Sequence, residues 1–185
     1  MKIILATPVK QGDSIVDGEG IRAVIWTQGC AHKCPGCHNP QTHSFDGGFE
    51  LDIEEVKEEI DALVGQDGVT FSGGDPFYQV EACLELAKYI KSKKLNIWCY
   101  TGFTYESLIS LSKNNPKIKE FIKTIDVLID GPFLLEQKSL DCAFRGSKNQ
   151  RIIDTKESLK QKKVCLVEKY YQEKKKKNER RGLYV

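Results

Sequence analysis

The chain has 185 residues, of which 40% are hydrophobic and 9% aromatic, and it carries a formal net charge of +2. This length and composition are sufficient for one buried core, so we expect a single globular body. The apolar run near the N-terminus covers only residues 3–6, and nowhere do 18 apolar residues follow one another. We therefore expect a cytoplasmic protein without a signal peptide or a membrane span.

The first predicted strand covers residues 21–27, a β-branched and apolar run that is closed by Gly29. A loop rich in cysteine, proline and glycine follows it directly. Further along, Asp52 with Glu55 three residues later has the spacing of a capping box. Apolar residues then recur at helical spacing as far as Leu63, which predicts an amphipathic helix.

The remainder of the chain repeats this alternation of strand and helix. Strands are expected at residues 69–71, 95–100 and 124–129, and helices at residues 80–91 and 105–111. Such alternation in units of about 30 residues predicts βαβ units with right-handed crossovers and a parallel sheet, so the expected fold class is α/β.

Unusual residues follow the predicted strands at the points where they end. Beyond the cysteine loop these are residues 72–75, 101–102 and 130–131. Because the carboxyl ends of parallel strands form the edge at which α/β folds bind ligands, we expect these segments to surround one site.

Positive charge is concentrated at the C-terminal end of the chain. Residues 156–185 contain eleven Lys or Arg against four Glu, including four consecutive lysines at residues 174–177. Such a run can contact nucleic acid or an acidic partner protein. A solvated basic helix or tail is the interpretation we favour, and we divide the chain into a domain of residues 1–155 and a basic C-terminal helix or tail of residues 156–185.

Three of the seven cysteines, Cys30, Cys34 and Cys37, lie within eight residues. An odd cysteine count with such close spacing is untypical of a disulfide framework and typical of a metal site in a reducing compartment. The other four stand singly in apolar or mixed runs, which predicts ordinary buried thiols: Cys83, Cys99, Cys142 and Cys165.

Thiolates are the ligands that iron-sulfur clusters and zinc prefer. Three thiolates from one loop leave a metal position open, whereas structural zinc sites have four protein ligands, so the pattern favours a site that does chemistry. A zinc site completed by His32 or His38 remains an alternative, although no second pair of Cys or His follows downstream. A simple electron-transfer cluster would require a fourth cysteine with motif spacing, which the single cysteines lack.

The turn Ser72-Gly73-Gly74-Asp75 adds a second candidate element. Two glycines allow bare backbone to approach a ligand and to offer it N–H and C=O groups. A tight turn without a ligand is the alternative, but the expected position on the same sheet edge as the cysteines favours a shared site.

Together, the Cys30-x3-Cys34-x2-Cys37 spacing and the Gly-Gly-Asp turn resemble the signatures of the radical S-adenosylmethionine (SAM) superfamily. The resemblance implies that the three cysteines hold three irons of a 4Fe-4S cluster, while the amino and carboxylate groups of SAM chelate the fourth. It also implies a set of residues that contact the cofactor: Gly36, Cys37, His38, Ser72, Gly73, Gly74 and Asp75.

A longer series of segments resembles the activating proteins of anaerobic, class III, ribonucleotide reductases, in the same order and with similar spacing from about residue 12 to residue 153. The sequence Arg-Gly-Ser-Lys-Asn-Gln at residues 145–150 is the part most particular to that family. Gly36 also fits these activating proteins, which have glycine before the third cysteine, whereas the wider superfamily often has an aromatic residue there. The other segments are residues 16–22, 29–30, 34–39, 72–76, 98–102 and 127–131.

This resemblance implies an incomplete (β/α)6 barrel of the radical SAM type in residues 1–155, open on one side. It implies that an electron donor such as flavodoxin or ferredoxin reduces the cluster, and that SAM is cleaved to methionine and a 5′-deoxyadenosyl radical. The radical takes a hydrogen atom from a glycine of the partner, the anaerobic ribonucleoside-triphosphate reductase. We expect no side chain to act as a general acid or base, because hydrogen-atom abstraction needs placement and no proton relay.

Three other functions remain open from the sequence. An activase of another glycyl radical enzyme often carries an insert with two extra clusters, and residues 39–51 contain no cysteine to hold them. A small-molecule radical enzyme such as a deazapurine synthase shares the size and the three cysteines but does not explain residues 145–150. A zinc-binding nucleic-acid module would explain the cysteines and the basic tail, although we expect neither a nucleic-acid partner nor a membrane.

Overall fold

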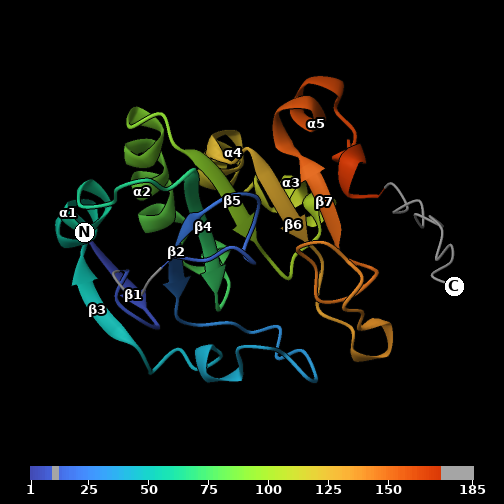
Figure 1. Cartoon of the computed structure of the whole chain (residues 1–185), viewed down its shortest axis with the longest axis horizontal. Coiled ribbons are helices and arrows are strands. Elements are labelled where there is room, and N and C mark those ends of the chain that lie inside the picture. Colours follow the sequence, from blue (N-terminus) through green and yellow to red (C-terminus); the bar gives the residue numbers. More distant parts are fainter. Residues whose placement is uncertain (10–12, 172–185) are drawn as a thin grey trace, which may run out of the picture.

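A seven-stranded sheet with one layer of helices packed against it forms the protein (Figure 1). The computed structural model describes residues 1–9 and 13–171. Neighbouring helices contact one another in a row: α1 (Ile53–Asp61) packs on α2 (Val80–Ser92), α2 packs on α4 (Pro116–Thr124), and α4 packs on α3 (Tyr105–Leu111) and α5 (Thr155–Gln161). None of the helices in the described ranges has the length and apolar character that crossing a membrane requires.

Four parallel strands form the centre of the sheet: β2 (Arg22–Thr27), β4 (Gly68–Gly73), β5 (Asn96–Tyr100) and β6 (Val127–Asp130). Antiparallel strands flank them, with β1 (Lys2–Leu5) and β3 (Phe49–Asp52) on one side and β7 (Arg151–Asp154) on the other. The order is β3-β1-β2-β4-β5-β6-β7, so the sheet is mixed and does not close on itself.

The predicted α/β class is confirmed, and each predicted strand or helix corresponds to an element of the structure. The expectation of a parallel sheet holds only for the four central strands, because β1 pairs antiparallel with β2, β3 with β1, and β7 with β6. The strand predicted at residues 124–129 begins only at Val127, because residues up to Thr124 belong to α4.

Local sequence signals explain where the helices begin. The capping box at Asp52 is formed, with the Asp52 N–H donating to Glu55 Oε2 at 2.8 Å, and α1 follows it. Asn115 caps α4, whose first residue is Pro116, as expected for a residue that lacks an N–H to satisfy. Apolar residues of these helices meet the sheet in one core, in which the buried rings of Phe71 and Phe121 pack edge to face with centroids 5.4 Å apart.

After α5 the chain returns beside β7, where Leu166 forms a bridge to Ile153. Tyr170 then packs on Trp98 of β5, with ring centroids 5.8 Å apart. The lysine run at residues 174–177 lies outside the described residues, as does the rest of the predicted tail from residue 172 onward. The division of the chain at residue 155 therefore stays a prediction.

Candidate functional site

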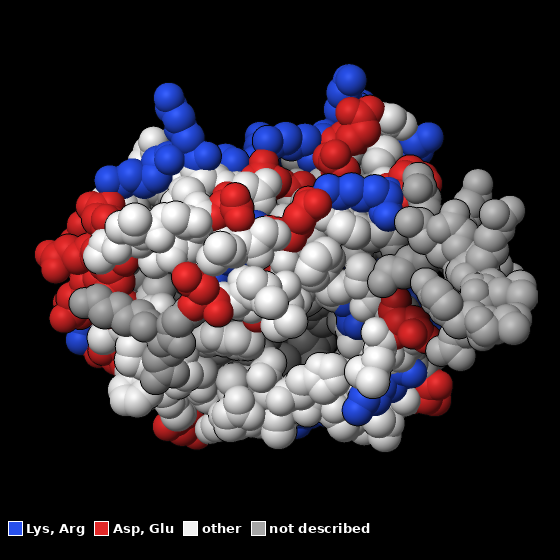
Figure 2. Space-filling view, in the orientation of Figure 1, with Lys and Arg blue, Asp and Glu red and all other residues white. Residues whose placement is uncertain are grey.

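Loops at the carboxyl ends of the four parallel strands line one cavity of about 560 Å³. Its opening is the hollow in the lower half of Figure 2, and its rim consists largely of side chains that are neither acidic nor basic. Residues 15–17, before β2, and residues 138–146, between β6 and β7, complete the walls. The cysteine loop and the turns after β4, β5 and β6 are thus brought together, as the sequence predicted.

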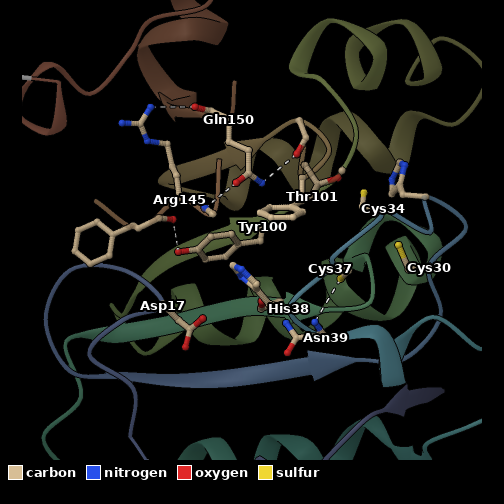
Figure 3. A pocket seen from close by; sticks show the side chains of 18 of the residues that line it. Asp17, Cys30, Cys34, Cys37, His38, Asn39, Tyr100, Thr101, Arg145 and Gln150 are labelled. Atoms are coloured by element: carbon tan, nitrogen blue, oxygen red, sulfur yellow. Dashed lines mark hydrogen bonds between the residues drawn. The ribbon is translucent and has the colours of Figure 1, made fainter. Parts of the chain in front are cut away.

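Cys30, Cys34 and Cys37 all line this cavity. Figure 3 shows their sulfur atoms at one end of it, with Asp17 and Arg145 toward the opposite end. Backbone hydrogen bonds hold the loop: the N–H of Cys30 donates to the carbonyl of His43 at 3.0 Å, and that of Cys37 donates to the carbonyl of Cys34 at 3.1 Å. The loop therefore presents three thiols from a constrained backbone.

The environment of the thiols favours metal coordination over free nucleophilic chemistry. Burial raises the pKa of the Cys30 thiol above its ordinary value, and burial does the same for Cys34. Thiols of this kind react poorly as nucleophiles, but a coordinated metal ion deprotonates them outright. The Asn39 N–H donates to Cys37 Sγ at 3.4 Å, which is a contact that stabilises a charged sulfur.

The donor set of this loop suits a 4Fe-4S cluster. Three thiols line one wall of the cavity, and thiolates are the ligands that iron-sulfur clusters prefer. In such a cluster each cysteine binds a different iron, so three cysteines leave one iron without a protein ligand. In residues 1–9 and 13–171, no three His, Cys, Asp or Glu side chains converge closely enough to hold one metal ion.

The two histidines considered as further zinc ligands differ in their contacts. His32 Nε2 lies 2.9 Å from Asp75 Oδ2, and the ring of His38 packs on Phe133 with centroids 5.0 Å apart. Both rings line the cavity, so His38 is available for a cofactor contact at its surface.

Ser72, Gly73 and Gly74 line the cavity beside the cysteine loop. The turn is joined to that loop, because the Asp75 N–H donates to the Gly29 carbonyl at 3.0 Å. A Cβ atom on Gly74 would lie 2.4 Å from the same carbonyl oxygen. Glycine is therefore required at this position by the approach of two protein loops, in addition to any approach of a ligand.

Two of the predicted cofactor contacts do not line the cavity. Gly36 has φ +73, and a Cβ atom there would lie 2.9 Å from a methyl carbon of Leu135, so its place is in the turn between Cys34 and Cys37. Asp75 is fully buried behind the turn, where its carboxylate accepts several hydrogen bonds from the protein.

Residues 145–150 brace the loop that follows β6. Gln150 Oε1 accepts hydrogen bonds from the N–H groups of Gly146 and Ser147 at 2.9 and 3.2 Å, and its amide nitrogen donates to the Gly131 carbonyl at 3.1 Å. Asn149 donates to the carbonyl of Pro132 at 2.8 Å. Arg145, Gly146 and Gln150 line the cavity, so this segment forms part of its wall.

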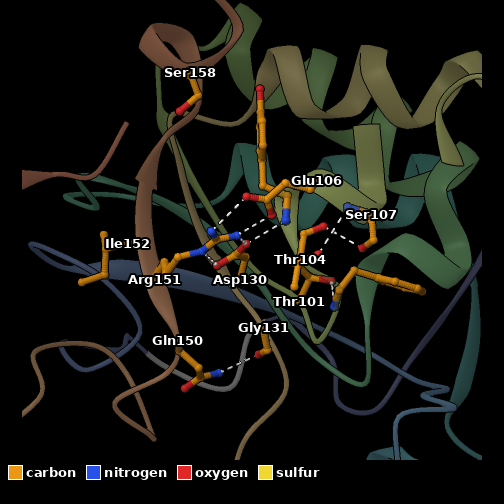
Figure 4. A network of polar contacts seen from close by, with 12 residues as sticks. Thr101, Thr104, Glu106, Ser107, Asp130, Gly131, Gln150, Arg151, Ile152 and Ser158 are labelled. Carbon is orange, nitrogen blue, oxygen red and sulfur yellow. Dashed lines mark hydrogen bonds and ion pairs between the residues drawn. The ribbon is translucent and has the colours of Figure 1, made fainter. Parts of the chain in front are cut away.

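An ion-pair network fixes the end of β6 just outside the cavity (Figure 4). Arg151 donates from Nε to Asp130 Oδ1 at 2.9 Å and from Nη2 to Glu106 Oε2 at 2.7 Å, while the Tyr105 N–H donates to Asp130 Oδ2 at 2.7 Å. Hydrogen bonding to Asp130 raises the pKa of Arg151 further, and hydrogen bonding to Arg151 lowers that of Glu106. The network therefore joins β7, β6 and α3 just outside the cavity.

Several lining residues were missed by sequence reasoning. Asp17, Tyr100 and Phe144 line the cavity, and the Tyr100 hydroxyl donates to the Phe144 carbonyl at 2.9 Å. Cys142 also lines it and is only half-buried, as is Cys165, so the prediction of buried thiols was wrong for these two and right for Cys83 and Cys99. The segment around Cys142 has no strand or helix pattern that would have indicated its return to the site.

Residues 16–153 match the protein family described as a 4Fe-4S single cluster domain. The anaerobic ribonucleoside-triphosphate reductase-activating protein of Haemophilus influenzae is 33% identical over 75% of this chain and 90% of its own. Proteins of the same name from Escherichia coli K12 and Enterobacteria phage T4 are 32% and 34% identical, each over 74% of this chain and over 90% and 86% of their own chains.

The chain belongs to this family of activating proteins. Membership confirms the resemblance found in the segments between residues 12 and 153. The range that matches the 4Fe-4S domain contains all three clustered cysteines and ends before the basic tail. The family therefore assigns an iron-sulfur domain to the part of the chain that forms the cavity.

Proposed function

We propose that the protein is an oxidoreductase of the radical SAM superfamily that generates a glycyl radical on anaerobic ribonucleoside-triphosphate reductase. Relatives with a 4Fe-4S domain are named as activating proteins of that reductase, which supports both the activity and the partner. The observation that carries the proposal is the position of Cys30, Cys34 and Cys37 at one end of a cavity that extends well beyond them.

The size of this cavity suits a cofactor beside the cluster. About 560 Å³ lies within the range of about 300–1,000 Å³ found for small-molecule sites. In this proposal the three cysteines hold the cluster, and the backbone of Ser72, Gly73 and Gly74, which line the cavity beside them, receives the methionine end of SAM. When bound, the reduced 4Fe-4S cluster supplies the electron that cleaves SAM to methionine and a 5′-deoxyadenosyl radical.

The remaining walls orient the cofactor and limit the access of water. Tyr100, Phe133 and Phe144 provide aromatic surface, and Arg145 and Asp17 provide charged groups at the end away from the cysteines. A reactive radical is protected from side reactions when its site excludes water. No residue is assigned a role as general acid or base, since the step is the transfer of a hydrogen atom.

The rim of the cavity supports a protein as the substrate. Three large apolar side chains at the rim are strongly exposed: Ile15 at 73%, Val16 at 70% and Leu140 at 95%. Exposed apolar residues gathered around one opening are typical of an interaction site. We also propose that β2, β4, β5 and β6 are the parallel part of an incomplete (β/α)6 barrel, and that the protein works in the cytoplasm with flavodoxin or ferredoxin as electron donor.

Anaerobic incubation of the reconstituted, reduced protein with SAM and the reductase of the same organism tests the proposal. We expect release of 5′-deoxyadenosine and the doublet signal of a glycyl radical in the electron paramagnetic resonance (EPR) spectrum of the reductase. Release of 5′-deoxyadenosine without a radical on the reductase would contradict the partner. Absence of both products from iron-loaded protein would contradict the activity itself.

A further inference from the structure

His32 lies between the first two cysteines and contacts a carboxylate from a different part of the chain. Its Nε2 atom is 2.9 Å from Asp75 Oδ2. The side chain of His32 is 18% exposed, and that of Asp75 is completely buried. The contact thus joins the cysteine loop to the turn after β4 on the side away from solvent.

Protein donors already occupy the carboxylate of Asp75. Thr101 Oγ1 and the Gly102 N–H donate to Oδ2 at 2.8 and 2.9 Å, and the Phe77 N–H donates to Oδ1 at 3.0 Å. With His32 this makes four donors, and an ionised carboxylate has about four acceptor positions. Because a carboxylate accepts hydrogen bonds, we assign Nε2–H of His32 as the donor in its contact with Asp75.

The imidazole ring of His32 sits in a socket formed by the turn after β5. A Cβ atom on Gly102 would lie 2.4 Å from this ring, so only glycine leaves room for it. The ring of Phe103 packs edge-on with centroids 4.6 Å apart, and that of Tyr78 lies at 5.9 Å. Position and orientation of the imidazole are therefore both fixed by residues outside the cysteine loop.

The loop needs such support because its backbone is strained beside this histidine. Lys33 has φ +47, in the left-handed region that side chains other than glycine rarely adopt. Residues in such conformations persist where the surrounding structure holds them. The contact between His32 and Asp75 is a side-chain hydrogen bond that ties this part of the loop to the turn after β4.

We propose that His32 is a positioning residue, which acts through Asp75 to keep Cys30 and Cys34 in the arrangement that binds the cluster. This inference rests on the proposed cluster site. It also moves Asp75 from the cofactor-binding residues to the support of the cysteine loop, in line with its absence from the cavity wall. Partners that orient metal ligands from behind typically change metal affinity by about 10–100-fold when they are removed.

Two substitutions separate the hydrogen bond from the shape of the ring. His32→Phe keeps an aromatic ring in the socket and removes the donor, whereas His32→Gln places an amide donor near the position of Nε2. Asp126→Asn is the matched control, because Asp126 also accepts several hydrogen bonds but lies at the opposite edge of the sheet, before β6. Each protein is reconstituted anaerobically, and iron retention against a chelator and the EPR spectrum of the reduced cluster are measured.

We expect His32→Phe to retain iron about tenfold more weakly and to show an altered EPR spectrum, since orienting partners of metal ligands have effects of this size. In iron retention and EPR spectrum, His32→Gln and Asp126→Asn should match the unmodified protein. Native iron retention and spectrum in His32→Phe would overturn the proposal, and so would equal losses in both His32 variants. If the unmodified protein binds no iron at all, the proposed function fails, and that result is separate from a defect confined to the variants.

Discussion

The carbonyl oxygen of Gly29 lies 2.4 Å from the position that a Cβ atom on Gly74 would occupy. Gly29 directly precedes the first cysteine, and Gly74 belongs to the turn that follows β4. The turn and the cluster loop therefore touch backbone to backbone, and neither can shift without moving the other.

Gly74→Ala should consequently damage the cluster site as well as the turn. The added methyl group must push the cysteine loop away, which we expect to cost about 1–3 kcal/mol of stability, as overpacking does. Iron content after reconstitution and thermal unfolding measure the two effects. Gly65→Ala is the control: a Cβ atom there meets no atom within 4 Å, so any loss of stability comes from its φ of +89 and not from contact with the cysteine loop. Full iron content in Gly74→Ala would show that the two loops can separate without harm.

Replacement of Cys30, Cys34 or Cys37 by Ala should prevent assembly of a stable cluster, because two thiolates do not hold it firmly. Cys83→Ala should keep the iron, since Cys83 is fully buried in α2 away from the cavity. Iron analysis and EPR spectroscopy of each variant provide the measurement. An iron content unchanged in Cys34→Ala would contradict the assignment of the ligands.

Cys142 requires its own experiment because it is a fourth thiol on the cavity wall. If the open iron position belongs to SAM, Cys142→Ala should assemble a normal cluster and show the same change of the EPR spectrum when SAM is added. A cluster that is lost in Cys142→Ala would instead indicate a site closed by four protein ligands, which leaves no position for SAM.

Sequence patterns predicted the central part of the fold because strands buried on both faces are continuous apolar runs, such as residues 69–71, and amphipathic helices such as α1 have a clear period and cap. The strands β1, β3 and β7, which have four residues each, were not predicted. Their positions depend on pairing with residues far along the chain.

The functional site, like the fold, could be predicted from the sequence only in part. Cys30, Cys34 and Cys37 are close in sequence, so their spacing alone indicates a shared ligand set. His32 and Asp75 are 43 residues apart, and both can be read as cofactor or metal contacts until the structure shows that they bind each other. Asp17 lies in the segment 16–22 that resembles the family, but nothing in that segment indicated a place in the site. Cys142 lies in no such segment, and the packing of their loops brings both residues to the cavity.

Asp126 should contribute to stability in a pH-dependent manner. Burial would raise the pKa of this carboxyl group, but hydrogen bonds from Lys156, Lys91 and the Ile97 N–H outweigh burial and lower it. A carboxylate whose pKa is lower in the folded state stabilises the fold fully above its unfolded pKa, about 3.9, and loses this contribution as the pH falls through the folded value.

We therefore expect Asp126→Asn to unfold at a lower temperature than the unmodified protein at pH 7, with a loss of about 1–3 kcal/mol for hydrogen bonds to a charged group. The difference should shrink as the pH falls below about 4, because the unfolded chain binds a proton at this carboxylate first and the native protein does so at a lower pH. Thermal unfolding between pH 3 and 7 measures it, with Asp61→Asn as a control at a fully exposed ion pair. A difference that is constant over this range would contradict a role for the charge.

Leu140 should matter for the protein partner, because it is the most exposed apolar side chain on the rim of the cavity. A reductase segment that reaches the cavity has to pass this rim, and burying a carboxylate there is costly. Leu140→Glu should therefore lower the yield of glycyl radical per SAM cleaved by about tenfold, which corresponds to about 1.4 kcal/mol of docking energy.

The ratio of the glycyl radical on the reductase, measured by quantitative EPR, to the 5′-deoxyadenosine released gives this yield. Val64→Glu is the matched control, since Val64 is 87% exposed and lies in the loop before β4, at the opposite edge of the sheet. Equal ratios for the two variants would show that the apolar rim does not receive the partner.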